Sequence, residues 1–130
     1  MKKITGEWLS SAKDDLKVIV RAIDDESLTH QVAFHSQQAI EKSLKAIIEE
    51  YEIVFIRTHS LETLIAKTNS YIELPVDIIL LRKLDQLYID ARYPGDLGLL
   101  PNGKPDITEA HLFQLTAEEI YSKVIHHLSK

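Results

Sequence analysis

Residues that interrupt or cross-link a chain are scarce in this sequence of 130 residues, which has no cysteine, four glycines and four prolines. Without cysteine, the chain forms no disulfide, no thiolate metal site and no thiol nucleophile, and it suits a reducing compartment. Three of the glycines and three of the prolines fall between Pro94 and Asp106. Long stretches therefore lack a helix-breaking residue, and this predicts a helical protein.

An excess of positive charge and a long apolar run are also absent. Fifteen basic and twenty acidic residues give a net charge of −5 and a pI near 5.6. The protein as a whole therefore does not attract nucleic acid electrostatically, and any contact with RNA or DNA is expected to be local. No apolar run approaches the ~18 residues that cross a bilayer, and the first residues lack an apolar targeting segment. We therefore expect a cytoplasmic protein that does not bind membranes.

The remaining composition is that of one globular domain over residues 1–130, with 45% apolar and 27% charged residues. Apolar residues at helical spacing predict an all-α, four- to five-helix up-and-down bundle, in which Pro94–Asp106 is the one long loop. The expected helices cover, in chain order, Glu7–Asp24, Leu28–Tyr51, Ser60–Asn69, Pro75–Arg92 and a segment from a cap at Asp106 or Thr108 almost to the C-terminal end.

The pattern also predicts one helix start, one extended link and one buried helix face. Pro75 is expected in the first turn of its helix, where a residue without an N–H is tolerated. The segment Glu52–Thr58 is expected to be a short extended link. The buried side of the second helix is expected to consist of Val32, Ile40, Leu44, Ile47, Ile48 and Tyr51.

The second expected helix also carries the most specific pattern. Residues 34–46 read Phe-His-Ser-Gln-Gln-Ala-Ile-Glu-Lys-Ser-Leu-Lys-Ala. This run resembles the hallmark of HEPN domains, which is an aromatic residue, two further residues and Gln-Gln-Ala-x-Glu-Lys-x-Leu-Lys-Ala. Three further segments resemble the family, in the right order along the chain. The first helix carries Trp8, Ala12, Asp15 and Leu16, as the first helix of the family does. The run Thr58-His59-Ser60-Leu61 is similar to the family's Thr-His-Asp-Leu turn, and Ala91-Arg92-Tyr93-Pro94 is similar to its Ala/Ser-Arg-Tyr-Pro signature.

The resemblance implies a helical bundle that is usually a homodimer. Small stand-alone HEPN proteins are often paired with a separate minimal nucleotidyltransferase in a toxin–antitoxin-like arrangement. The resemblance thus implies a dimeric module that binds a nucleotide, RNA or its partner protein and works with such a nucleotidyltransferase. Apolar residues that favour a covered surface support dimerisation, and these are Ile53, Val54, Phe55, Leu97, Leu99 and Leu100.

The alternative function is enzymatic, because many HEPN proteins are metal-independent ribonucleases with an Arg followed about four to six residues later by a His. Arg92 is the natural arginine, but Leu97 stands where a four-residue spacer would place the histidine, so the motif is incomplete. In this alternative, Arg92 holds the phosphate and His35 or His59 transfers protons. The incomplete motif favours the binding module over the enzyme.

The first group of candidate binding residues lies on one polar face of the second helix and consists of His35, Gln38, Lys42 and Lys45. A proton-active ring, an amide and two ammonium groups suit a phosphate or an acidic partner surface. The alternative is a solvated helix face, supported by an i,i+4 pair between Glu41 and Lys45.

Two further groups flank the short helix and the long loop. Arg57 and His59 precede the short helix, where they could help to hold an anion, or where Thr58 or Ser60 simply caps the helix. The other group, Arg92, Tyr93 and Asp96, begins the loop, where Arg92 could instead bond the last helix carbonyls and Tyr93 could pack. No metal site or cofactor is expected, because no histidine pair has the helical spacing of a zinc site with a nearby carboxylate.

Overall fold

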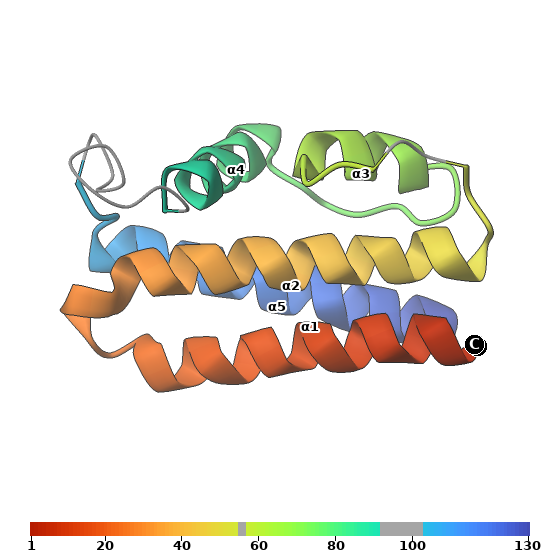
Figure 1. The fold of residues 1–130 in the computed structure, drawn as a ribbon, viewed down its shortest axis with the longest axis horizontal. Coiled ribbons are helices and arrows are strands. Elements are labelled where there is room, and N and C mark those ends of the chain that lie inside the picture. The colour runs from red at the N-terminus through yellow and green to blue at the C-terminus, as the bar shows by residue number, and fades with distance from the viewer. Residues whose placement is uncertain (55–56, 92–102) are drawn as a thin grey trace.

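The computed structural model describes residues 1–54, 57–91 and 103–130. The all-α prediction is confirmed, because this part of the chain contains helices and no strand (Figure 1). The helices are α1 (Lys3–Ala22), α2 (Thr29–Glu50), α3 (Leu61–Thr68), α4 (Ile78–Ala91) and α5 (Ile107–Leu128), with a 3₁₀ turn at Glu26–Leu28 before α2. Within these described segments, no helix is both long enough and apolar enough to span a membrane.

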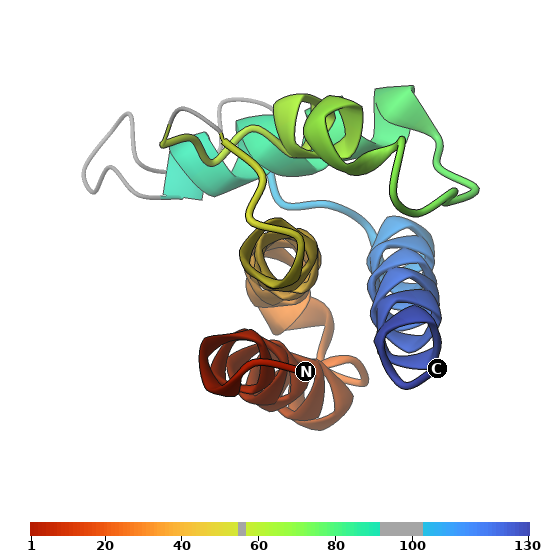
Figure 2. The same cartoon turned by 90° about the vertical axis from the view of Figure 1, so that its right-hand side faces the viewer.

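The helices form two layers. α1, α2 and α5 lie with their axes alongside one another, and α3 and α4 cover α2 from one side (Figure 1). α1 and α2 are antiparallel, whereas α5 runs in the same direction as α2. Figure 2 looks along α2 and shows α4 lying across it. As a result α2 is the central helix, which contacts each of the others.

Side-chain caps fix the beginnings of the last three helices. Ser60 Oγ accepts the Thr63 N–H at 3.3 Å, which confirms the predicted cap of α3. Asp106 forms a capping box with Glu109 at the start of α5, so Asp106 rather than Thr108 is the cap. Each such acceptor satisfies an N–H group that has no carbonyl partner within its helix.

The expected start of α4 at Pro75 is wrong. The helix begins at Ile78, and Asp77 Oδ1 accepts the N–H groups of Ile79 and Leu80 at 3.0 and 3.2 Å. Proline presets the backbone angle of a first turn but offers no acceptor, whereas the Asp77 carboxylate bonds two unpaired amides. The start of α1 also differs, since it lies at Lys3, before the expected Glu7.

A smaller apolar cluster consists of Ile19, Ala22, Ile23, Val32 and Ala110, and the main core gathers apolar side chains of all five helices around α2. Its fully buried side chains include Ile40, Leu44, Ile47, Leu61, Leu64, Leu81, Leu84, Phe113 and Ile120. The predicted burial of Tyr51 is wrong, because α2 ends at Glu50 and the Tyr51 side chain remains 39% exposed. The chain turns directly after Tyr51, at Glu52, whose φ of 53° lies in the left-handed region.

Candidate functional site

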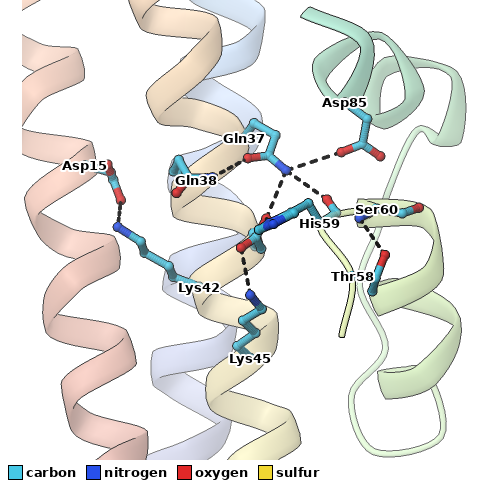
Figure 3. A network of polar contacts seen from close by, with 10 residues as sticks. Asp15, Gln37, Gln38, Lys42, Lys45, Thr58, His59, Ser60 and Asp85 are labelled. Atoms are coloured by element: carbon cyan, nitrogen blue, oxygen red, sulfur yellow. Dashed lines mark hydrogen bonds and ion pairs between the residues drawn. The ribbon is translucent and has the colours of Figure 1, made fainter. Parts of the chain in front are cut away.

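A buried carboxylate, Asp15 of α1, organises one side of the α2 polar face. The Asp15 side chain is 9% exposed, and its Oδ1 accepts a hydrogen bond from His35 Nδ1 at 2.7 Å. Its other oxygen, Oδ2, accepts from Lys42 Nζ at 2.8 Å (Figure 3). Two such charge-assisted hydrogen bonds offset the free-energy cost of removing the Asp15 carboxylate from water. His35 and Lys42 are thus engaged inside the protein, where they join α2 to α1.

A second buried carboxylate, Glu41, lies on α2 itself and organises the part of this helix next to the turn before α3. The Glu41 side chain is 4% exposed, and its Oε2 accepts from Lys45 Nζ at 2.8 Å. Its Oε1 accepts from His59 Nδ1 at 3.0 Å, so the residue before α3 is tied to α2. Lys45 Nζ also lies 5.2 Å from the centre of the Trp8 ring, within range of a cation–π contact. The i,i+4 pair predicted for a solvated face is present, but its carboxylate is buried and its lysine is only 13% exposed.

The amide of Gln37 joins these elements to α4. Its Nε2 lies 2.9 Å from the backbone oxygen of His59, and 3.3 Å from both Glu41 Oε1 and Asp85 Oδ1 (Figure 3). Its Oε1 accepts from Gln38 Nε2 at 2.7 Å. Gln37 is fully buried, and each amide group has a partner. One side chain of α2 therefore fixes both the turn before α3 and the middle of α4.

The carboxylate of Asp85 completes this network from α4. Its Oδ2 accepts the backbone N–H of Leu61 at 2.9 Å, which satisfies one of the first amides of α3. Burial raises the pKa of the Asp85 carboxyl above its ordinary value, while the hydrogen bonds from Leu61 and Gln37 oppose this rise. Asp85 thus positions α3 against α4 and presents a partly shielded acceptor.

His59 and Asp85 line an open hollow with a volume of about 430 Å³, together with Ser60, Tyr88 and Ile89. We call it the His59 hollow. The His59 side chain is 52% exposed, and its ring centre lies 5.6 Å from that of Tyr88. Because Nδ1 bonds the Glu41 carboxylate, Nε2 is the nitrogen that a ligand meets. The hollow can therefore offer a fixed imidazole, an acceptor and apolar surface to one bound group.

Comparison with known proteins identifies the fold that builds this site. Residues 5–127 match the family model of the HEPN domain. The chain belongs to the HEPN domain family. Its structure is similar to the crystal structure of TT1696 from Thermus thermophilus, with a TM-score of 0.76 and 21% sequence identity, over 97% of this chain and 99% of that chain. No curated protein matches the sequence.

Polar residues of the HEPN hallmark run thus form hydrogen bonds and ion pairs within the protein. Of the four polar-face residues predicted as a binding group, His35 and Lys42 share Asp15, Lys45 bonds Glu41, and Gln38 bonds Gln37. The four do not converge on one ligand position. Their role in binding a nucleotide or partner stays a prediction.

Of the residues before α3, His59 reaches the hollow and Arg57 is exposed. The capping alternative for this turn is also present, because Thr58 Oγ1 accepts the Ser60 N–H at 3.0 Å and Ser60 caps α3. Two groups of sequence predictions lie outside the described residues: the candidates Arg92, Tyr93 and Asp96, and the expected interface residues Phe55, Leu97, Leu99 and Leu100.

Sequence reasoning did not assign a site role to Gln37, Glu41 or Asp85. Gln37 and Glu41 are four residues apart within the hallmark run, so they project from the same side of α2, and this spacing is a signal that the sequence contains. Asp85 follows Leu84 directly in α4, and nothing in its spacing shows that its oxygens reach Leu61 and Gln37. That contact exists only because α4 lies across α2 (Figure 2).

Proposed function

We propose that this HEPN domain is a binding module for a nucleotide or an RNA segment, and that it acts as a homodimer with a minimal nucleotidyltransferase in a toxin–antitoxin-like pair. The observation that carries the binding function is the His59 hollow, where a half-exposed imidazole is held by a buried carboxylate. Holding the ring in advance lowers the conformational cost of binding, because the side chain needs no further ordering.

The chemistry of the hollow suits a nucleobase with its attached sugar and phosphate. The faces of the His59 ring and the apolar side chain of Ile89, which is 47% exposed, offer surface for a flat base. Asp85 supplies an acceptor for base or ribose donors. The exposed Arg57, two residues before His59, supplies the positive charge that a phosphate requires. This positive charge of Arg57 is local, because the chain as a whole has a net charge of −5.

The test is binding of a fluorescently labelled single-stranded RNA, with unlabelled ATP as a competitor. We expect His59→Ala to weaken RNA binding about tenfold, because stacking of one base contributes ~1–3 kcal/mol. His111→Ala is the matched control, since His111 is an exposed histidine of α5 away from the hollow. Equal affinity of both variants and the wild type would contradict the proposed site, and so would absence of binding by the wild type.

The homodimer and the nucleotidyltransferase partner are supported by membership of the HEPN family and by exposed apolar residues. Val54 is 90% exposed and Ile79 of α4 is 76% exposed, so both offer apolar surface that a second protein can cover. We expect a dimer mass by light scattering at micromolar concentration. We also expect co-purification with a minimal nucleotidyltransferase encoded next to this chain. A monomer that retains no such protein would contradict this part of the proposal.

A second candidate function, a metal-independent ribonuclease, is favoured by the Glu41–His59 pair. A carboxylate that accepts from Nδ1 holds the imidazole in the tautomer whose Nε2 can accept a proton, here with Nδ1 and Oε1 3.0 Å apart. In this function His59 takes the proton of an RNA 2′-hydroxyl, whose oxygen attacks the adjacent phosphorus, and Arg92 neutralises the phosphate. The bond to the 5′-oxygen breaks, and this leaving oxygen takes a proton from water. The binding module ranks first because the family's Arg and His motif is incomplete.

Incubation of labelled RNA with the purified protein and a chelator separates the two functions. Cleavage that resists the chelator and is lost in both Arg92→Ala and His59→Gln would establish the ribonuclease. Binding without cleavage would favour the module. Growth arrest on expression, relieved by co-expression of the nucleotidyltransferase, would show that the pair acts as toxin and antitoxin.

A further inference from the structure

Three rings form an exposed row at the end of the molecule opposite to the connection between α1 and α2. The ring centres of Tyr51 and Tyr71 lie 4.8 Å apart, and those of Tyr51 and His127 lie 5.9 Å apart. The Tyr51 hydroxyl lies 2.8 Å from His127 Nε2, which fixes the rings relative to each other. The two tyrosines remain 39% and 43% exposed, so the row, which we call the Tyr–His row, is accessible to a ligand.

A second hollow, with a volume of about 400 Å³, adjoins this row. His127 belongs to both, and Ile72 and Glu73 of its lining follow Tyr71 directly in the chain. Lys123, His126 and Lys130 also line this hollow, so two ammonium groups accompany a single carboxylate, that of Glu73. None of these side chains takes part in the contacts of Asp15, or in those of Glu41, Gln37 and Asp85 beside the His59 hollow.

We propose that the Tyr–His row and the adjoining hollow form a second binding site, which takes a small nucleotide. The base stacks against the rings, as aromatic side chains bind any nucleobase through its flat face. The phosphate lies in the hollow, where Lys123 offers an exposed ammonium group without a partner in the described part of the chain.

The observations favour a ligand site over a purely structural cluster. The helix dipole accounts for basic groups in the last turn of α5, because the carbonyl end of a helix attracts cations. It does not account for two large aromatic rings that pack against each other outside the core while each keeps more than a third of its surface in water. Aromatic surface beside cationic side chains and a hollow is the arrangement that a base and its phosphate require.

The test is a titration of the full chain with adenosine 5′-monophosphate, in which NMR reports the ring resonances of Tyr51 and Tyr71. We expect saturable shifts of both rings. We expect Lys123→Ala to weaken binding about fivefold and Tyr71→Leu about tenfold, as one charge contact and one stacking contact predict. Lys13→Ala, which removes an exposed lysine of α1, is the matched control and should bind like the wild type.

The readout separates this site from the His59 hollow, because His59→Ala should leave the tyrosine shifts unchanged. Absence of saturable ring shifts in the wild type would overturn the proposal. Unchanged binding by both Lys123→Ala and Tyr71→Leu would also overturn it. Equal shifts with inorganic phosphate alone would show that no base is recognised, and that result too would refute a nucleotide site.

Discussion

Removing the charge of Glu41 tests the claim that the polar face of α2 is an internal network. Glu41→Gln keeps the size of the side chain but leaves Lys45, which is 13% exposed, without its carboxylate. His59 loses the same partner, although water reaches its half-exposed ring. The cost therefore comes mainly from the buried ammonium group of Lys45.

The magnitude follows from this burial. Breaking a buried ion pair on one side costs ~3–5 kcal/mol when the remaining charge has no access to water. Lys45 retains some access through its exposed fraction and keeps its contact with Trp8, so we expect a loss of about 2–3 kcal/mol. The double variant Glu41→Gln, Lys45→Met should recover part of this loss, because no unpaired charge remains.

The measurement is urea unfolding followed by circular dichroism, with the free energy extrapolated to water. Glu62→Gln is the matched control, because it breaks a pair with Arg82 whose side chains are 44% and 61% exposed. Exposed pairs contribute little, so the control should remain close to the wild type. If Glu41→Gln unfolded at the same urea concentration as Glu62→Gln, the buried network would not stabilise the fold.

Three further predictions concern the core, a helix cap and pH. Phe113→Ala should lower the free energy of unfolding by ~3–5 kcal/mol, whereas Leu115→Ala on the exposed side of α5 should change it little. Equal urea midpoints of these two variants would contradict the assigned core. Asp106→Ala should cost ~1 kcal/mol through loss of the α5 cap, with Thr108→Ala as the control, and thermal unfolding measures both. Burial lowers the pKa of His30, and nearby Lys104 adds to this, so the native state favours the neutral ring. The unfolded chain then binds more protons, so the free energy of unfolding should fall as the pH drops below about 6.5. This fall should be smaller in His30→Gln, and a urea midpoint of the wild type that stays constant between pH 7 and pH 5 would contradict the prediction.

Much of the fold could be predicted because helical spacing is a local property of the chain. The apolar stripes that include Leu44 and Phe113 placed the core, and the acceptors at Ser60 and Asp106 placed two helix starts. The start of α4 was missed because Pro75 and Asp77 both signal a helix start, and only the hydrogen bonds to Asp77 distinguish them. His59 was a candidate from sequence, but its partner Glu41 is separated from it by 18 residues.

The sequence by itself determined that this chain is helical, which faces of the helices are apolar, and, through the hallmark run on α2, that it resembles HEPN domains. These properties depend on residues a few positions apart, whose relation is set by the geometry of one helix. Only the tertiary structure decided that Asp15 and Glu41 are buried acceptors, that Asp85 meets Gln37 and Leu61, and that His59 stands at a hollow. The physical reason is that these contacts join different helices, and their existence depends on how α1, α3 and α4 pack around α2, which no local spacing specifies.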